Sequence, residues 1–374
     1  MFMYIMSALL AVIAFSFYYF YIRRACTVAG IDIKTDRAFG AVIALIAACL
    51  AAVFASDMGI GAVFTLHILV FALVFDFANF IVKKACKKRY ADGCKAWKTV
   101  YGSGIVPLVA ALVMVIAGYA VMNNVVRADY SVFTKKSLRA EGYTVALISD
   151  VHYGISIDGA ELDRICDEIS AAYPSVVVLC GDIVDESTTA DGMREVFDTL
   201  GSIKSEFGVF YVYGNHDRQL YSDTAAFTEA ELEQAITDSG ITVLRDEAYT
   251  VNSELTLIGR EDRSYRANGG RKPIAELMNG VDPNSFVITL DHQPHEYAEN
   301  ADAGVDLILS GHTHGGQIFP ANLLFDLFKL NDLNYGHATI GEHCQAIVTS
   351  GLAGWGFPVK TSAPAEYVIA EIKN

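Results

Sequence analysis

The sequence is short of several features that would each define a class of protein. It contains no internal repeat and no low-complexity segment. Its seven cysteines show no close pairing: four fall in or beside apolar segments of the first third, and Cys166, Cys180 and Cys344 are scattered through the rest. A disulfide framework is therefore excluded as the basis of the fold, and buried free thiols are expected instead.

Basic residues are scarce in the C-terminal two thirds. Residues 1–122 contain 11 Lys and Arg against 5 Asp and Glu, whereas residues 123–374 contain 17 against 38. An acidic domain is a poor partner for a phosphate backbone, so no nucleic acid is expected among the ligands. The surplus of carboxylates suits bound divalent cations. The contrast in charge between the two parts indicates that they occupy different surroundings.

The first third is rich in long apolar runs, which account for a mean hydropathy of +0.33 over the chain. Four runs, at residues 3–22, 38–55, 59–82 and 104–122, each approach the roughly 20 residues that cross a bilayer. The first has no basic start and no small-residue cleavage site, so a retained helix is predicted rather than a signal peptide. We therefore expect a multi-pass cell-membrane protein, with residues 1–122 as a transmembrane region of about four helices.

The basic residues between these runs predict the orientation. The positive-inside rule places basic loops in the cytoplasm, which puts both termini and the acidic domain on the extracytoplasmic side. Within the third run, Asp76 and His67 are expected to have structural roles, Asp76 by snorkelling or by pairing with nearby lysines. The basic residues are Arg23, Arg24, Lys34 and Arg37 after the first run, and Lys83, Lys84, Lys87, Lys88, Arg89, Lys95 and Lys98 after the third.

A connector is expected over residues 123–142. From residue 143 the sequence changes to short apolar runs separated by segments with helical spacing. Continuous apolar runs such as YTVALISD, SVVVLCGD and FVITLDH indicate strands that are buried on both faces. Strands separated by helices in this way predict an α/β layered domain over residues 143–374. One intervening segment, DGAELDRICDEISAAY, has helical spacing that places on one face Leu162, Ile165, Cys166 and Ile169.

Polar residues follow five of the predicted strands, at the point where each strand ends. Ligands of open α/β sheets bind beyond the carboxyl ends of strands, so these side chains can converge on one point. In GHTH, the alternation of an extended segment lets both rings point the same way, and the flanking glycines permit close approach of the backbone. The residues are Asp150 and His152 in DVH, Asp182 and Asp185 in GDIVD, Asn215, His216 and Asp217 in GNHD, Asp291 and His292 in DH, and His312 and His314 in GHTH.

The mixture of residue types indicates a metal centre. A single Asp after a strand is usually a turn or capping residue, but five such clusters together are hard to explain in that way. The absence of cysteine disfavours a thiolate zinc site. Imidazole with carboxylate and amide oxygens suits Mn²⁺ first, with Fe, Zn²⁺ or Mg²⁺ as alternatives. The candidates are too many for one tetrahedral ion, so two divalent ions that share a bridging ligand are predicted.

The order of DxH, GDxxD, GNHD, a strand-end histidine and GHTH resembles the signature of the calcineurin-like metallophosphoesterase superfamily. The tail, with GHTHGGQIFP and GLAGWGFPVK, is similar to the bacterial membrane-associated branch. The resemblance covers residues 143–374 and implies a four-layer αββα sandwich of two packed sheets flanked by helices. It implies these roles: Asp150, His152 and His314 on the first metal ion, Asn215, His292 and His312 on the second, Asp182 as the bridge, His216 as the catalytic histidine oriented by Asp217, and Asp185 as support for the ligands.

These roles imply a membrane-anchored hydrolase that cleaves phosphate ester or pyrophosphate bonds by attack of a hydroxide bridging two metal ions. Some members of that branch act on lipid-linked or nucleotide-diphosphate substrates, so a lipid-linked or envelope phosphate ester is an expected partner. The alternative is a non-catalytic metal-binding sensor or interaction module on a membrane anchor.

One segment departs from the family pattern, and a second has two interpretations that the resemblance does not decide between. Where related sequences offer an arginine before GLG, this chain has Ser350 in VTSGLAG, and the candidates to replace that cation are Arg218, Arg260 and Arg263. The apolar segment ANLLFDLFKLNDLNYG follows the metal motif. Its simpler interpretation is a helix packed in the core or on the membrane part, and the other is a segment that rests on the bilayer or lines an acyl groove.

Overall fold

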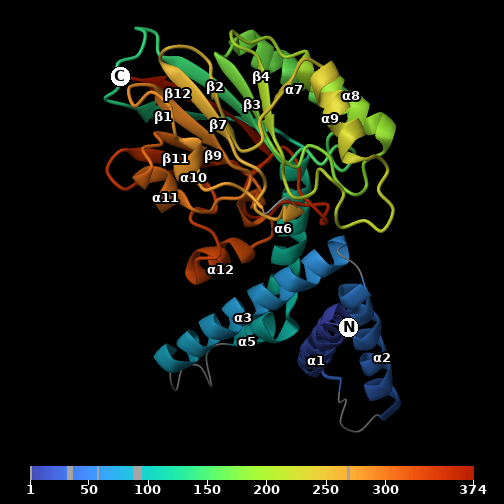
Figure 1. The fold of residues 1–374 in the computed structure, drawn as a ribbon. Coiled ribbons are helices and arrows are strands. Elements are labelled where there is room, and N and C mark those ends of the chain that lie inside the picture. The colour runs from blue at the N-terminus through green and yellow to red at the C-terminus, as the bar shows by residue number, and fades with distance from the viewer. Residues whose placement is uncertain (1, 32–36, 57–58, 87–94, 268–269) are drawn as a thin grey trace. The chain divides into compact units, whose positions relative to one another are not determined.

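The computed structural model describes residues 2–31, 37–56, 59–86, 95–267 and 270–374 (Figure 1). The chain divides into two compact units. The helical unit comprises Met1–Ala120 and a short later segment, Gly356–Thr361. The α/β unit comprises Val121–Trp355 and Ser362–Asn374. A six-residue piece of the C-terminal region therefore belongs with the N-terminal helices.

Each of the four predicted apolar runs coincides with a helix, to within one residue at its start. Within the described ranges, α3 and α6 are the helices long and apolar enough to cross a membrane. The expectation of about four spans is therefore supported for two helices, and the orientation stays a prediction. The helices of this part are α1 (Phe2–Val28), α2 (Arg37–Ser56), α3 (Ile60–Cys86), α5 (Lys95–Ser103) and α6 (Ile105–Met122).

Polar side chains in the helical unit have local partners. Asp76 of α3 pairs with Arg24 of α1 at 2.8 Å and accepts a hydrogen bond from the Tyr101 hydroxyl, so among the described residues its cation is an arginine of α1 rather than a lysine. The Nδ1 atom of His67 lies 2.7 Å from the carbonyl oxygen of Val63, one turn earlier. Of the basic residues used for the orientation, four lie outside the described residues: Lys34, Lys87, Lys88 and Arg89.

The α/β unit is built on two six-stranded mixed sheets (Figure 1). The first has the order β1-β12-β2-β3-β4-β5 and the second the order β10-β11-β9-β8-β7-β6. β2, β3 and β4 are parallel neighbours, and so are β8 and β9, so within each set the carboxyl ends lie at one edge. The strands are β1 (Val126–Phe133), β2 (Tyr143–Ile148), β3 (Val176–Cys180), β4 (Val209–Val212), β5 (Thr242–Val243), β6 (Glu247–Thr250), β7 (Leu255–Gly259), β8 (Phe286–Leu290), β9 (Leu307–Ser310), β10 (Gly336–Ile340), β11 (Cys344–Val348) and β12 (Glu366–Lys373).

Three apolar cores hold these layers together. The core outside the first sheet joins Leu179 of β3 to Ile165 of α7 and Phe197 of α8. A second core lies between the sheets and includes Leu147 and Ile288, and a third covers the outer face of the second sheet. The predicted α/β domain with two packed sheets is thereby confirmed. The helices are α7 (Gly159–Ala172), α8 (Ala190–Gly201), α9 (Glu229–Asp238), α10 (Ile274–Leu277), α11 (Tyr297–Asp302), the 3₁₀ turn η2 (His314–Gly316) and α12 (Ala321–Phe328).

Local sequence signals explain α7 well. Asp158 caps its first turn by accepting a hydrogen bond from the backbone N–H of Glu161. The predicted apolar face is confirmed, because its four members are all buried.

Three cysteines of the α/β unit, Cys166, Cys180 and Cys344, are also buried free thiols, as expected.

The predicted connector over residues 123–142 contains a strand that the sequence pattern does not reveal. β1 pairs in parallel with β12, from Val126 opposite Glu366 to Phe133 opposite Lys373. Only Val132 of this strand is buried, so the alternation of apolar and polar residues is weak. Its strand conformation depends on a partner at the far end of the chain.

Candidate dinuclear metal centre

Five strands bring the predicted site residues together where their carboxyl ends meet. In the first sheet, β2 leads to Asp150 and His152, β3 leads to Asp182, and β4 leads to Asn215 and His216. In the second sheet, β8 and β9 lead to the remaining histidines. The side chains form two groups in which the ligand atoms lie within 4.8 Å of one another: Asp150, His152 and His314, and Asp182, His292 and His312.

Asp182 lies between the two groups. Its Oδ2 atom is 3.0 Å from Nε2 of His292 in its own group and 3.9 Å from Nε2 of His152 in the other. Its Oδ1 atom accepts a hydrogen bond of 2.8 Å from the backbone N–H of His216, which holds the carboxylate in place. A carboxylate within reach of imidazoles on both sides has the position that a bridging ligand needs.

Several ligand atoms at this centre are buried and have no hydrogen-bond partner among the described residues. They include Nε2 of His152, Nε2 of His292 and Oδ1 of Asn215. Polar atoms buried in this way cost free energy unless something else satisfies them. Imidazole nitrogens gathered with carboxylate and amide oxygens therefore fit divalent cations such as Mn²⁺, Fe or Zn²⁺.

The second ring nitrogen of three histidines is held by an oxygen atom. Nδ1 of His152 lies 3.1 Å from Oδ2 of Asp185, which sits behind the ring. Nδ1 of His292 lies 2.7 Å from the carbonyl oxygen of Cys180, and Nδ1 of His314 lies 3.1 Å from that of Ala353. With the proton on Nδ1, each Nε2 keeps its lone pair for a metal ion.

Electrostatics favours anionic carboxylates and a neutral His312 at the centre. Burial alone would raise the pKa of Asp182, but the surrounding imidazoles, His292 first, hold it well below its usual range. Burial is likewise outweighed at Asp185, where hydrogen bonds from His152 and Ser187 lower the pKa to about 2. Burial and the neighbouring His292 lower the pKa of His312 to about 4. Near neutral pH the carboxylates are therefore anionic, and His312 is neutral.

The backbone is strained at the same residues. Five of the candidate ligands have φ between 40° and 71°, a region that residues with a side chain rarely adopt. Glycine makes the close contacts around them possible: a Cβ atom on Gly311 would collide with the Ser149 hydroxyl and the Asp150 carboxylate. The close approach expected for the glycines around GHTH is confirmed at this position. The strained residues are Asp150, His152, Asp182, His312 and His314.

His216 lies beside the first group, with its ring centroid 5.5 Å from that of His152. Its Nδ1 atom is 2.7 Å from Oε2 of Glu186. Burial alone would lower the pKa of His216, but the hydrogen bond to Glu186 and the charge of Asp182 outweigh burial and raise it. The rings of Tyr221 and Trp355 flank the imidazole, with centroids at 5.1 and 4.9 Å. The environment therefore favours a charged imidazolium.

The structure differs from the expectation for Asp217, which does not orient His216. Its carboxylate accepts backbone N–H groups from the turn after β3 and from Gly214, so it joins the turns that carry Asp182 and Asn215. The carboxylate that reaches His216 is Glu186, the residue directly after GDIVD. The sequence analysis missed Glu186 because nothing in its local pattern distinguishes it from a surface glutamate.

Replacing Glu186 by glutamine is expected to lower kcat about tenfold, because His216 loses the charge that favours its protonated, oriented form. KM and bound metal should change little. Steady-state kinetics with metal analysis would test this, with Glu276→Gln, an exposed glutamate of α10, as the matched control. A kcat equal to that of the parent protein would contradict the role.

Two of the three arginines considered for phosphate binding are already engaged. Arg218 pairs with Glu261 at 2.9 Å, and Arg260 pairs with Glu296 at 2.9 Å. Arg263 is exposed. An arginine that the sequence analysis did not consider, Arg271, pairs with Asp291 at 2.9 Å. Asp291 therefore supports the strand end next to His292 and belongs to neither metal group.

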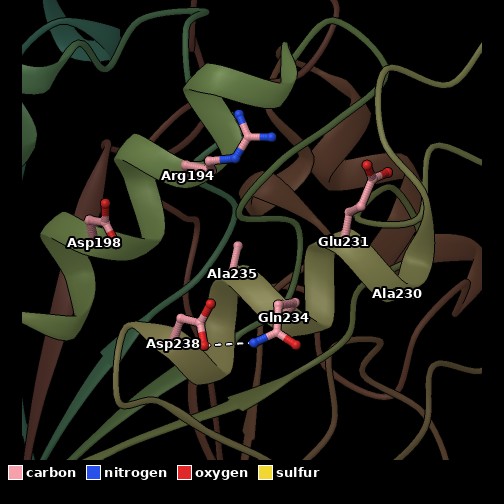
Figure 2. Close-up of a pocket in the computed structure, with 7 residues that line it drawn as sticks. All are labelled: Arg194, Asp198, Ala230, Glu231, Gln234, Ala235 and Asp238. Atoms are coloured by element: carbon pink, nitrogen blue, oxygen red, sulfur yellow. Dashed lines mark hydrogen bonds between the residues drawn. The ribbon is translucent and has the colours of Figure 1, made fainter.

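A surface pocket of about 590 Å³ lies between α8 and α9 (Figure 2). It has no histidine, and none of its residues belongs to either metal group. The metal centre, and not this pocket, is therefore the candidate catalytic site. The residues that line the pocket are Arg194, Asp198, Ala230, Glu231, Gln234, Ala235 and Asp238.

The chain is similar to several known proteins. The family model described as calcineurin-like phosphoesterase matches residues 143–316. A transmembrane protein with a metallophosphoesterase domain from Danio rerio is 29% identical over 82% of this chain and 71% of its own length. A metallophosphoesterase from Helicobacter pylori is 31% identical over 59% of this chain and 57% of its own length. A crystal structure of a dimetal phosphatase from Danio rerio covers 63% of this chain and 94% of its own, with 14% identity and a TM-score of 0.43.

Proposed function

Residues 143–316 belong to the calcineurin-like phosphoesterase family, and on this premise we propose that the protein is a membrane-anchored hydrolase that uses two metal ions to cleave phosphate ester or pyrophosphate bonds. The observation that carries the proposal is the pair of ligand groups, buried except for the half-buried His312, with Asp182 between them. A sensor or interaction module would not require a protonated His216, flanked by two aromatic rings, beside the two ligand groups.

In this proposal Asp182 would be a ligand to both ions. When bound, they would activate water as a nucleophile and offset the negative charge on the phosphate. Mn²⁺ is the proposed occupant, because nitrogen and oxygen donors are mixed in both sets. The proposed ligands are Asp150, His152 and His314 for one ion, and Asn215, His292 and His312 for the other.

The remaining residues act on protons and on position. His216, kept charged by Glu186, would donate a proton to the leaving oxygen. Asp217 would hold the turn that presents Asp182. Tyr221 and Trp355 would restrict the access of water to the ring of His216.

Membrane anchoring is supported by two helices, α3 and α6, and by the transmembrane description of the Danio rerio relative. If the basic loops lie in the cytoplasm, the α/β unit lies outside it. A lipid-linked or other envelope phosphate ester is then the proposed substrate class.

The test uses the full chain in detergent, stripped of metal by a chelator and reloaded with Mn²⁺, Zn²⁺ or Mg²⁺. Hydrolysis of bis-p-nitrophenyl phosphate and of p-nitrophenyl phosphate should disappear on stripping and return most strongly with Mn²⁺. The ratio of the two rates would separate a diesterase from a monoesterase. No bound metal and no hydrolysis of either ester would contradict the proposal and favour the sensor alternative.

A further inference from the structure

The exposed side chains of α12 are mostly apolar. A surface helix ordinarily turns its apolar stripe toward the core, yet no residue of α12 is buried. Leu327 is 71% exposed and Phe328 is 66% exposed. This differs from the simpler expectation of packing within the core. The exposed apolar face, here called the α12 face, consists of Leu323, Leu324, Leu327, Phe328 and Leu330.

The polar side of α12 is attached to the loop over residues 311–317, which carries His312 and His314 and is here called the metal-site loop. Asp326 accepts a hydrogen bond from the Asn334 side chain, and the carbonyl oxygen of Asn334 accepts one of 2.6 Å from the hydroxyl of Thr313, the residue between His312 and His314. At the start of the helix, Asn322 packs closely against Gly316. Any side chain at position 316 would collide with Asn322. The α12 face is therefore held in a defined position beside the site.

Further apolar side chains surround the site on other loops. Trp355 and Tyr221 flank His216, and they are 36% and 62% exposed. Leu220 and Ile155, on the loops after β4 and β2, are also exposed. A site for small, hydrated phosphate esters has no need of such a rim, whereas a site that meets acyl chains does.

The chain itself links this side of the α/β unit to a candidate membrane helix. Gln317, in the metal-site loop, bonds to the backbone N–H groups of Trp355 and Ser362 at 3.0 and 3.2 Å. The segment between those two residues belongs to the helical unit, where the N–H of Lys360 donates to the carbonyl oxygen of Gly118 in α6.

The second link between the units is equally short. Only three residues separate Met122, the last of α6, from Val126, the first of β1. Four peptide links span at most about 14 Å. If α6 crosses the bilayer, these two links tether the α/β unit to it, and Gln317 is hydrogen-bonded to the residues on either side of the segment that contacts α6.

We propose that the α12 face and the apolar rim rest in the interfacial layer of the bilayer that α6 crosses, so that the metal centre takes phosphate esters borne by membrane lipids. The proposal rests on the proposed function for its catalytic part. The proposed occupant of the α12 face is the bilayer. Both short links tether the α/β unit to α6, so the bilayer that α6 crosses is the apolar phase within its reach. Apolar side chains of an interfacial helix enter the boundary between headgroups and acyl chains, which places a neighbouring site at the level of the phosphates.

Tryptophan fluorescence of the full chain in phosphatidylcholine vesicles tests the contact. The sequence has two tryptophans, so a third is a clear addition to the emission of the parent protein. Phe328→Trp is the reporter, and Phe133→Trp is the control, because the two phenylalanines are 66% and 64% exposed and Phe133 belongs to β1 and not to the α12 face. With lipids brominated on the acyl chains, the added emission of Phe328→Trp should be quenched about twofold or more, and that of Phe133→Trp should not.

Two results would overturn the membrane contact. Unquenched, red-shifted emission from Phe328→Trp would mean that water covers the α12 face. Unquenched but blue-shifted emission would mean that protein covers it, whether the helices of the same chain or a second copy, and dependence on protein concentration would separate these two.

A rate comparison tests the substrate class. The ratio of the rate on the p-nitrophenyl ester of a vesicle-borne phosphatidic acid to the rate on bis-p-nitrophenyl phosphate should fall about tenfold in Phe328→Ser, because one buried phenyl group is lost from the membrane contact. The ratio should keep its parent value in Phe133→Ser. An equal ratio in both variants would overturn the lipid-borne substrate. If the parent protein binds no metal and cleaves neither of these esters nor p-nitrophenyl phosphate, the proposed function fails, and the quenching still decides the membrane contact.

Discussion

Asp182→Ala is expected to abolish metal-dependent hydrolysis, with kcat/KM lower by about 10⁴-fold, or roughly 5.5 kcal/mol at 1.36 kcal/mol for each factor of ten. The reason is position. Asp182 lies 3.0 Å from His292 and 3.9 Å from His152, so its removal takes an anionic ligand from both groups at once. The substitution also removes a buried negative charge that would offset the charge of the two cations. Rates on bis-p-nitrophenyl phosphate at saturating Mn²⁺ would measure the loss.

A second readout of the same variant does not depend on activity. Ions that bind the folded state raise its thermal stability, so Mn²⁺ should raise the Tm of the parent protein and have little effect on Asp182→Ala. The matched control is Asp191→Ala, because the Asp191 side chain is 98% exposed in the first turn of α8. Retention of the Mn²⁺-dependent rise in Tm by Asp182→Ala would contradict its placement between two ions.

His216→Ala is expected to lower kcat by about 10²–10⁴-fold, the usual contribution of a general acid. Both metal groups are complete without this side chain, so bound metal and the Mn²⁺-dependent rise in Tm should be retained. The separation of turnover from metal content distinguishes His216 from Asp182. Metal analysis and single-turnover rates on the same preparation would measure it.

The leaving group gives this prediction a sharper form. p-Nitrophenolate departs with little need of a proton, whereas an unactivated phenolate needs one, so the deficit of His216→Ala should be larger for a phenyl ester than for a p-nitrophenyl ester. His337→Ala is the control, because His337 is exposed on β10. Equal deficits on both esters would show that His216 acts on something other than the leaving oxygen.

The strand-end clusters were predictable because their signals are local. A buried strand reads as a short apolar run, and the residue where it stops is visible in the sequence. Parallel strands then bring their carboxyl ends together, so the sequence could place Asp150 and Asp182 near one another, whereas His292 comes from the second sheet. The buried face of α7 was predictable for the same reason, because helical spacing repeats within a few residues.

Other features depended on neighbours that are distant along the chain. β1 is a strand because β12 pairs with it, and its own residues carry little alternation. Arg218 and Arg260 were candidates for binding phosphate until Glu261 and Glu296 proved to be their partners. The geometry of the turns brings the Glu186 carboxylate to His216. The Asp217 carboxylate instead accepts hydrogen bonds from the backbone of two turns. Sequence order alone could not distinguish these carboxylates, since a difference of one residue in a turn redirects a side chain.

The α12 segment shows where the two kinds of information meet. Its apolar composition and its place after GHTHGGQ are properties of the sequence, and both interpretations of the segment followed from them. Which side faces outward was decided by Asp326 and Gly316, whose contacts attach the polar side to the metal-site loop. Residue types and their spacing thus determined the chemistry of the centre, because coordination depends on which atoms are present. Burial and partner choice were decided by packing, because they depend on surfaces that meet only once the chain is folded.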